Sequence, residues 1–246
     1  MHGHRAETIG ARPRGQERFA VARGRRFTSS FAKLKSILSI IIAAAFAAAL
    51  LPGRVAAQEN PAQSLVDAAL ADLTKKRYDE ALKKLEEADK LAPNSPFILN
   101  LFGAIYTKKK DFDTARGYFE KALEAQSDFF PAKFNLGELL FLQKQYPQAL
   151  DYFSRMLREN PNNELLQFKV ILCLLQTRQI DEAKRLIAQM KFPGQEPAWY
   201  FAKAALAVAE GDKRKASEFL GGAEILYKDK TTLYRETFQD LGWPVK

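Results

Sequence analysis

Small side chains recur along this chain at an almost constant separation. The series consists of Ala81, Ala115, Ala149, Ala183 and Ala216. Its members are 34, 34, 34 and 33 residues apart, and a small or flexible residue follows each of them seven positions later. A unit of about 34 residues that recurs in this way is typical of a helix-turn-helix solenoid, in which each unit packs against its neighbours. The sequence therefore predicts an all-α stack of about five repeats.

Each unit is expected to hold two antiparallel helices. Apolar residues within a unit are spaced three and four apart, which puts them on one helical face. Two such helices approach closely only where neither side chain is large, so we expect the alanine series, together with Gly103 and Gly137, to pack the helices of each pair. A four-residue linker, 58–61, precedes the first unit. The units are predicted at 62–95, 96–129, 130–163, 164–196 and 197–230.

The tail, residues 231–246, predicts one more helix. Its apolar residues recur at helical spacing, and Gly242 and Pro244 follow them as a stop signal. A terminal repeat exposes an apolar face that another element must cover. We therefore expect a capping helix, with a partner-recognition helix as the alternative. The apolar stripe consists of Leu233, Tyr234, Phe238 and Leu241.

The pattern of the first 57 residues predicts a basic leader with an export signal. Residues 36–53 carry no charge, Lys33 and Lys35 precede them, and Val55 and Ala57 offer the small side chains of a cleavage site. We predict cleavage after Ala57 and an exported protein, periplasmic or secreted from a bacterial cell. The alternative is an uncleaved membrane anchor, with the repeats outside the cytoplasm, because about 18 apolar residues can just span a bilayer.

The positive charge of the chain lies almost entirely in this leader. The whole chain has a formal charge of +9, and residues 1–57 account for +8 of it with ten basic and two acidic residues. The remainder, with 28 basic and 27 acidic residues, has a net charge of +1. A nearly neutral body lacks the electrostatic footprint of a nucleic-acid-binding domain, so we expect no nucleic-acid partner.

Residues that commonly carry catalysis are scarce. Both histidines, His2 and His4, lie in the leader, so no Ser-His pair, Cys-His pair or histidine-containing zinc site can form in the repeats. The single cysteine, Cys173, stands in an apolar stretch and is expected to be buried. We predict no enzymatic activity, no catalytic residue, no metal site and no cofactor.

The repeat pattern resembles that of the tetratricopeptide repeat family over about 170 residues. The resemblance rests on the alanine series, on Gly103 and Leu136-Gly137, and on two inter-helix turns, Lys-Arg-Tyr-Asp-Glu-Ala at 76–81 and Lys-Gln-Tyr-Pro-Gln-Ala at 144–149. It implies a right-handed superhelical stack that binds peptides or partner proteins. It also implies that the second, fifth, ninth and twelfth residues of each first helix face the concave side.

Those concave positions are mostly apolar in this chain. They predict a groove with a phenylalanine ladder at its centre, which suits an amphipathic helix or an apolar peptide. The alternative is that the rings pack against one another or against the tail as ordinary core. Thr107 is a further polar contribution to this face. The predicted groove consists of Phe97, Asn100, Phe134, Glu138, Phe141, Phe168, Leu172, Leu175 and Phe201.

Taken together, these features predict an exported, non-enzymatic scaffold that binds a peptide or helix of a partner protein in an apolar concave groove. The alternative is a membrane-anchored structural subunit that uses its repeats to assemble an envelope complex or a homo-oligomer. In the first case the N-terminal segment is removed, and in the second it is the membrane contact.

Overall fold

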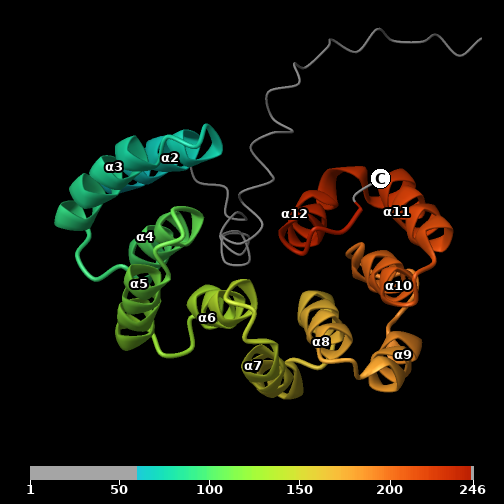
Figure 1. The fold of residues 1–246 in the computed structure, drawn as a ribbon. Coiled ribbons are helices and arrows are strands. Elements are labelled where there is room, and N and C mark those ends of the chain that lie inside the picture. Colours follow the sequence, from blue (N-terminus) through green and yellow to red (C-terminus); the bar gives the residue numbers. More distant parts are fainter. Residues whose placement is uncertain (1–59, 245–246) are drawn as a thin grey trace, which may run out of the picture.

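The computed structural model describes residues 60–244, which form helices and no strand (Figure 1). An all-helical repeat stack is thereby confirmed. The first helices of successive pairs are α2 (Pro61–Thr74), α4 (Pro96–Lys108), α6 (Phe130–Leu142), α8 (Glu164–Gln176) and α10 (Ala198–Ala209). The second helices are α3 (Tyr78–Leu91), α5 (Phe112–Ala125), α7 (Tyr146–Glu159), α9 (Ile180–Gln189) and α11 (Lys213–Tyr227). A short 3₁₀ turn, η2 (Lys228–Lys230), then leads to α12 (Thr232–Asp240).

The leader, its cleavage site and its possible anchor, residues 1–57, lie outside the described residues. Within residues 60–244, no helix combines the length and the apolar character needed to cross a membrane.

Each first helix ends in the same backbone motif. The second residue after the helix has a positive φ, 59° at Lys76 for example, which is the left-handed conformation common after a helix. The N–H of Lys76 donates to the carbonyl of Leu73 at 2.9 Å, and the N–H of Arg77 donates to that of Asp72 at 2.9 Å. These two bonds satisfy carbonyls that the helix end leaves free. The motif recurs at Lys110, Lys144, Arg178 and Gly211.

The two helices of a pair meet at small residues. All five alanines of the series are fully buried. Gly103 and Gly137 lie under the rings of Phe119 and Phe153, and a Cβ atom at either glycine would come within 2.4 Å or 2.6 Å of the ring. The large aromatic side chain of the second helix therefore fills the space that the glycine of the first helix leaves.

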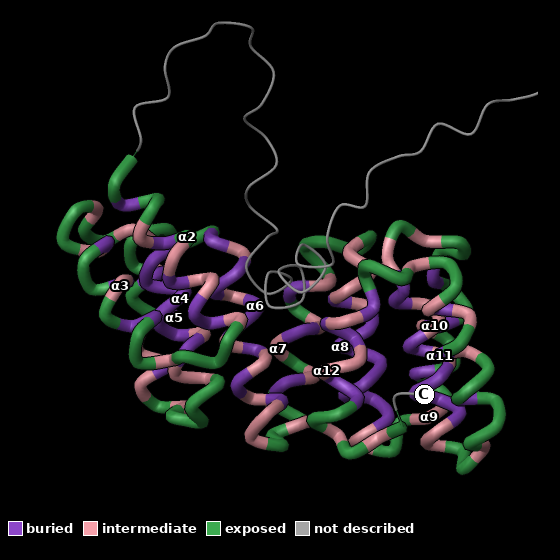
Figure 2. Tube along the Cα trace, turned by 90° about the horizontal axis from the view of Figure 1, so that it is seen from above, coloured by how far each residue is buried: buried purple, intermediate pink, exposed green. Residues whose placement is uncertain are grey.

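The pairs follow one another along an arc (Figure 1). First helices lie on its inner side, where α4 contacts α6 and α8 contacts α10, and second helices lie outside. Buried residues concentrate on the inner helices α4, α6, α8 and α10 (Figure 2). The final helix, α12, lies on the inner side of the arc beside α8 and α10 (Figure 1). It thus covers part of the concave face.

Candidate partner-binding site on the concave face

The phenylalanines of the middle units do not form an open groove. Phe134, Phe168 and Phe201 are 3%, 0% and 1% exposed. They belong to one hydrophobic cluster together with Leu172 and Leu175. This burial agrees with the alternative given above, in which the rings pack as ordinary core, and Phe141 is buried in the same cluster.

The physical reason for this burial is the return of α12 across the concave face. The ring of Tyr234 lies 5.0 Å from that of Phe168 and 5.2 Å from that of Phe201, measured between centroids. Phe238 packs edge-on against Phe201 at 5.4 Å. Leu233, Tyr234 and Phe238 are themselves buried, so the apolar face of the tail helix and the ladder bury each other.

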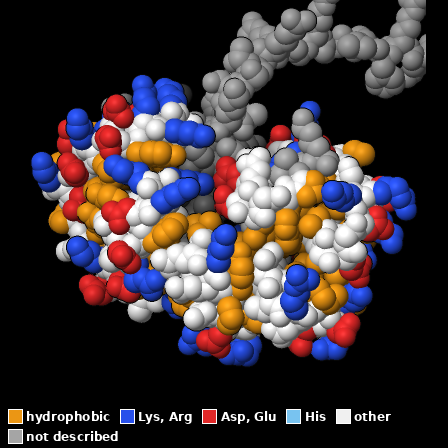
Figure 3. Space-filling model, viewed as in Figure 1, with side chains coloured by type: hydrophobic (Ala, Val, Ile, Leu, Met, Phe, Trp, Pro, Cys, Tyr) orange, Lys and Arg blue, Asp and Glu red, His pale blue; other side chains and the backbone are white. Residues whose placement is uncertain are grey.

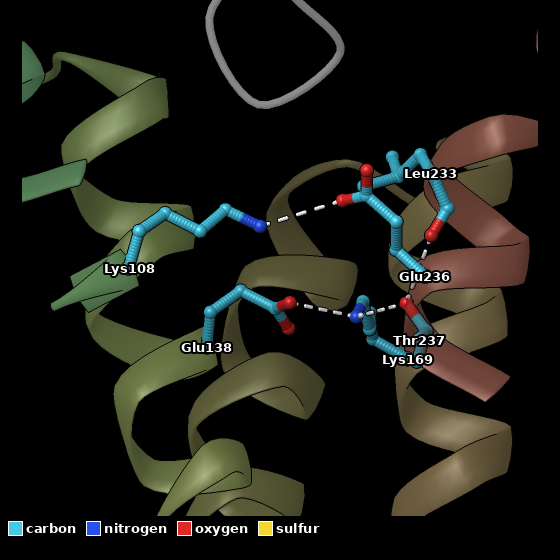
Figure 4. Close-up of polar contacts among 6 residues, drawn as sticks. All are labelled: Lys108, Glu138, Lys169, Leu233, Glu236 and Thr237. Carbon is cyan, nitrogen blue, oxygen red and sulfur yellow. Dashed lines mark hydrogen bonds and ion pairs between the residues drawn. The ribbon is translucent and has the colours of Figure 1, made fainter. Parts of the chain in front are cut away.

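A lysine that the sequence analysis did not single out lies at the centre of this face. Lys169, on α8, is 1% exposed, and its Nζ donates to Glu138 Oε2 at 2.7 Å and to Thr237 Oγ1 at 3.2 Å (Figure 4). Its ammonium also lies 5.2 Å from the centre of the Phe141 ring. Three helices, α6, α8 and α12, therefore meet at one buried cation.

The sequence does carry a signal for this residue. Lys169 is the single charge in the apolar run from Phe168 to Leu175. A lysine inside such a run must either reach the surface or find a buried partner, because burying an unpaired ammonium is costly. The partners lie 31 and 68 residues away in the chain, so their identity followed only from the tertiary structure.

A cavity of about 380 Å³ lies between α4, α6 and α12. Of the residues predicted to form the groove, Glu138 lines this cavity, and Thr107 lines it as well. Its other polar contributors include Lys108, Asn135, Glu236 and Thr237. Its apolar contributors include Leu73, Ala104, Phe119, Leu142 and Leu233. This cavity is thus more polar and closer to the N-terminus than the predicted groove.

Two buried groups near this cavity have unused hydrogen-bonding capacity. Asn135 Nδ2 donates to Asn100 Oδ1 at 2.9 Å, while Asn100 Nδ2 has no partner within the described part of the chain. Glu138 Oε1 is also buried and has no partner among these residues, whereas the other oxygen, Oε2, binds Lys169. Phe97, at the edge of the predicted groove, is half-buried and packs against the clusters of the first two units.

The mouth of the cavity is bridged by an ion pair. Lys108 at the end of α4 reaches across to Glu236 on α12, with 3.4 Å between Nζ and Oε2 (Figure 4). Both side chains are about one-third exposed, so the pair is screened by water and contributes little to stability. It nevertheless connects the second unit to the tail across the arc.

The remaining chemistry of the described residues is structural. Burial raises the pKa of the Cys173 thiol to about 12, so it stays protonated and unreactive at neutral pH. No group of three or more His, Cys, Asp or Glu residues in this part of the chain is arranged to hold a metal ion. Acidic and basic side chains are interspersed over the face shown in Figure 3.

Comparisons with known proteins agree with this architecture. The chain spans about a tenth to a fifth of the length of two curated relatives that it matches. RNA polymerase-associated protein CTR9 of Caenorhabditis elegans is 24% identical over 115 residues, 46% of this chain and 10% of that protein. Hsp70-Hsp90 organizing protein 2 of Arabidopsis thaliana is 28% identical over 109 residues, 44% of this chain and 19% of that protein.

Solved structures share the fold. A thermophilic TPR protein of Thermus thermophilus is 20% identical and superimposes with a TM-score of 0.58, covering 73% of this chain and 98% of that one. PilW, described as a widely conserved type IV pilus biogenesis factor, is 20% identical with a TM-score of 0.53, covering 74% and 86%.

Family profiles identify the repeats themselves. Two profiles described as tetratricopeptide repeat match residues 106–164 and 140–206. The matched region includes α5 to α9 in full, which alternate between outer and inner positions along the arc (Figure 1). The chain therefore contains tetratricopeptide repeats, which build the central part of its arc.

Proposed function

We propose that this chain is an exported, non-enzymatic scaffold that binds a segment of a partner protein on the concave face of its repeats. The observation that carries the proposal is the cavity between α4, α6 and α12. Its volume of about 380 Å³ falls in the range of ligand-binding clefts, and it combines apolar walls with a few polar groups.

The unused hydrogen-bonding groups support a polypeptide as the ligand. Among residues 60–244, Glu138, which lines the cavity, has no donor for its Oε1, and Asn100, whose partner Asn135 lines the cavity, has no acceptor for its Nδ2. A peptide supplies both donors and acceptors along its backbone. Satisfying a buried polar atom on binding removes a free-energy penalty that the unbound protein bears.

The residue inventory supports binding rather than catalysis. The described residues contain no histidine, and the only thiol is buried and protonated. The relatives also fit this role, since the Arabidopsis protein is named for organizing two other proteins. A tetratricopeptide repeat fold by itself does not specify the partner, which the site must select.

A cavity-filling substitution tests the binding site. Ala104→Phe places a ring in the cavity and leaves every native phenylalanine in place. Ala188→Phe on α9 makes the same change at an exposed position of the outer layer. Affinity capture from the cell-envelope fraction should recover a partner with the wild-type chain and with Ala188→Phe, but not with Ala104→Phe. Equal partner lists for all three chains would refute the concave site.

N-terminal sequencing of the protein isolated from its native cells distinguishes export with cleavage from the anchored alternative. Export with cleavage predicts a mature protein that begins at Gln58 and is recovered without detergent. A protein that retains residues 1–57 and is released only by detergent would instead favour the membrane-anchored subunit.

A further inference from the structure

The tail helix α12 occupies the concave face as a bound helical peptide would. Its buried side chains, Leu233, Tyr234, Thr237 and Phe238, lie on one helical face. Tyr234 and Thr237 contact α8, and Phe238 contacts α10. A helix that lays one apolar face into a groove is a recurring mode of peptide recognition. In this chain the helix and the groove belong to the same polypeptide.

The contacts of α12 are directional as well as apolar. Thr237 accepts a hydrogen bond from the buried Lys169, at 3.2 Å. One residue earlier, Glu236 pairs with Lys108 on the opposite side of the arc, at 3.4 Å. Figure 4 shows both contacts reaching α12 from different inner helices. The inner helices therefore bind a hydroxyl and a carboxylate at neighbouring positions of the helix that lies in the groove.

The connection to α12 is short and its docking is incomplete. A single 3₁₀ turn, Lys228–Lys230, separates α11 from α12, and α12 itself has nine residues. Beside α12 the cavity of about 380 Å³ stays open. A helix of nine residues is marginal on its own in water, so α12 depends on this groove for its order.

Resting on the function proposed above, we propose that α12 is an internal occupant of the partner site and that the partner is an amphipathic helix that displaces it. The partner helix presents two large apolar or aromatic side chains four residues apart, as Tyr234 and Phe238 are. Immediately before the second of these it carries a hydroxyl for Lys169, preceded by a carboxylate for Lys108. Side chains on its outer flank fill the cavity that lies open beside α12.

Charge complementarity selects this chemistry. Lys169 is held by one carboxylate, Glu138, and by the Thr237 hydroxyl, so a helix that replaces α12 must again offer that ammonium an oxygen. A purely apolar helix would leave the buried ammonium with an unmet hydrogen bond, which lowers affinity. Lys108 and Lys110 at the cavity mouth favour an acidic residue beside it.

An internal occupant lowers the apparent affinity for the partner. Only the fraction of molecules with α12 released can bind, so the apparent dissociation constant rises by the inverse of that fraction. Because α12 is tethered, its effective concentration at the groove is on the order of millimolar. Weakening α12 is therefore expected to strengthen partner binding, whereas an ordinary core element would show no such gain.

The test uses a fluorescein-labelled peptide of residues 230–243 as the probe and measures its anisotropy with the full chain. In a tail variant, Tyr234→Ser with Phe238→Ser, the peptide should bind at least about tenfold more tightly than to the wild-type chain. A peptide carrying the same two substitutions is the matched control and should not bind. Circular dichroism and size-exclusion chromatography establish that the tail variant is folded.

A milder α12 variant allows the same measurement if the tail variant does not fold. Glu236→Lys opposes Lys108 at an exposed pair and leaves the aromatic contacts intact, and it should raise peptide affinity by about two- to fivefold. Glu218→Lys on α11 reverses a charge at another exposed pair and should leave affinity unchanged. Equal affinity for the wild-type chain and both α12 variants would overturn the proposal.

Affinity capture with the tail variant and with Ala104→Phe tests this inference and the proposed function separately. Capture that the tail variant increases, and that Ala104→Phe abolishes, supports both. Capture that Ala104→Phe abolishes but that the tail variant leaves unchanged or reduces overturns the inference and keeps the function. A dimer formed by exchange of α12 between two copies would also overturn it, because the occupant would then be a second copy of the chain.

Discussion

Lys169 and Glu138 form an ion pair that is almost entirely removed from water, with 2.7 Å between Nζ and Oε2. The lysine comes from α8 and the glutamate from α6, so the pair joins two successive units of the arc. The rings of Phe134 and Phe141 lie within 6.0 Å and 5.2 Å of the ammonium. The core of the arc is thus built around a charge, and its stability depends on keeping that charge paired.

Replacing one member of this pair should destabilise the protein more than replacing both members together. Lys169→Met leaves a buried carboxylate without its cation, and Glu138→Leu leaves a buried ammonium, so each is expected to lower the free energy of unfolding by about 3–5 kcal/mol. The double variant removes both charges and should be less destabilised than the sum of the two. Urea denaturation of the four chains gives the coupling energy.

The surface pair of Arg185 and Glu182 on α9 provides the comparison, since both side chains are more than half exposed. Neutralising either of these should change the free energy of unfolding by less than about 1 kcal/mol. Additive effects at Lys169 and Glu138 would show that the pair is not coupled in the folded protein.

The two helix-pair glycines should not tolerate even one methyl group. A Cβ at Gly103 or Gly137 would come within 2.4 Å or 2.6 Å of a buried phenylalanine ring, so Gly→Ala at either position is expected to cost about 1–3 kcal/mol. Gly117, on α5, has open space around it. Gly117→Ala should therefore stabilise the protein by up to about 1 kcal/mol, because alanine is the better helix former.

Thermal unfolding of these three variants distinguishes packing from backbone effects. If Gly103→Ala and Gly117→Ala shifted the melting temperature in the same direction, the close approach of the paired helices would not be the reason for a glycine at position 103.

Acid should weaken the first unit through Asp72. This carboxylate is buried on α2, where a hydrogen bond from Lys84 lowers its pKa most strongly and Arg77 acts in the same direction, against the effect of burial. A group with a lowered folded-state pKa stabilises the protein above its unfolded-state pKa of about 3.9. That contribution disappears as the pH falls from there through the folded-state value.

Asp72→Asn should consequently lower the urea midpoint at pH 7, and its deficit should shrink as the pH falls below about 4. Asp151→Asn, at an exposed pair with Arg155, should behave like the wild-type chain throughout. A deficit at Asp72→Asn that does not vary with pH would show that the carboxylate acts through packing alone.

Cys173 should report on opening of the stack. Burial raises the pKa of its thiol to about 12, so iodoacetamide at pH 8 is expected to react far more slowly than with a free thiol, whose pKa is about 8.5. In urea, labelling should accelerate together with the loss of helical signal. Since the chain has one cysteine, mass spectrometry reads this site directly, and rapid labelling in native buffer would contradict its burial.

The sequence determined the repeat because the repeat is a local property. The alanine series, Gly103 and Gly137 predicted paired helices in a stack, and a helix pair of this kind is specified by residues that lie within about 34 positions of one another. The tail helix, too, followed from its own apolar stripe and stop signal. The left-handed residue that follows each first helix repeats with the same period. Four of these positions are not glycine, so the sequence gives no direct signal for the conformation; they are Lys76, Lys110, Lys144 and Arg178.

The occupant of the concave face was decided by tertiary structure alone. Periodicity places Phe168 and Phe201 on one face of their helices, but it does not say whether solvent, a partner or another part of the chain covers them. Contacts between α12 and residues more than 30 positions earlier settle this, and so does the pairing of Lys169 with Glu138 and Thr237. The physical reason is that local patterns specify which faces must be buried, whereas the curvature of the whole arc determines what reaches them.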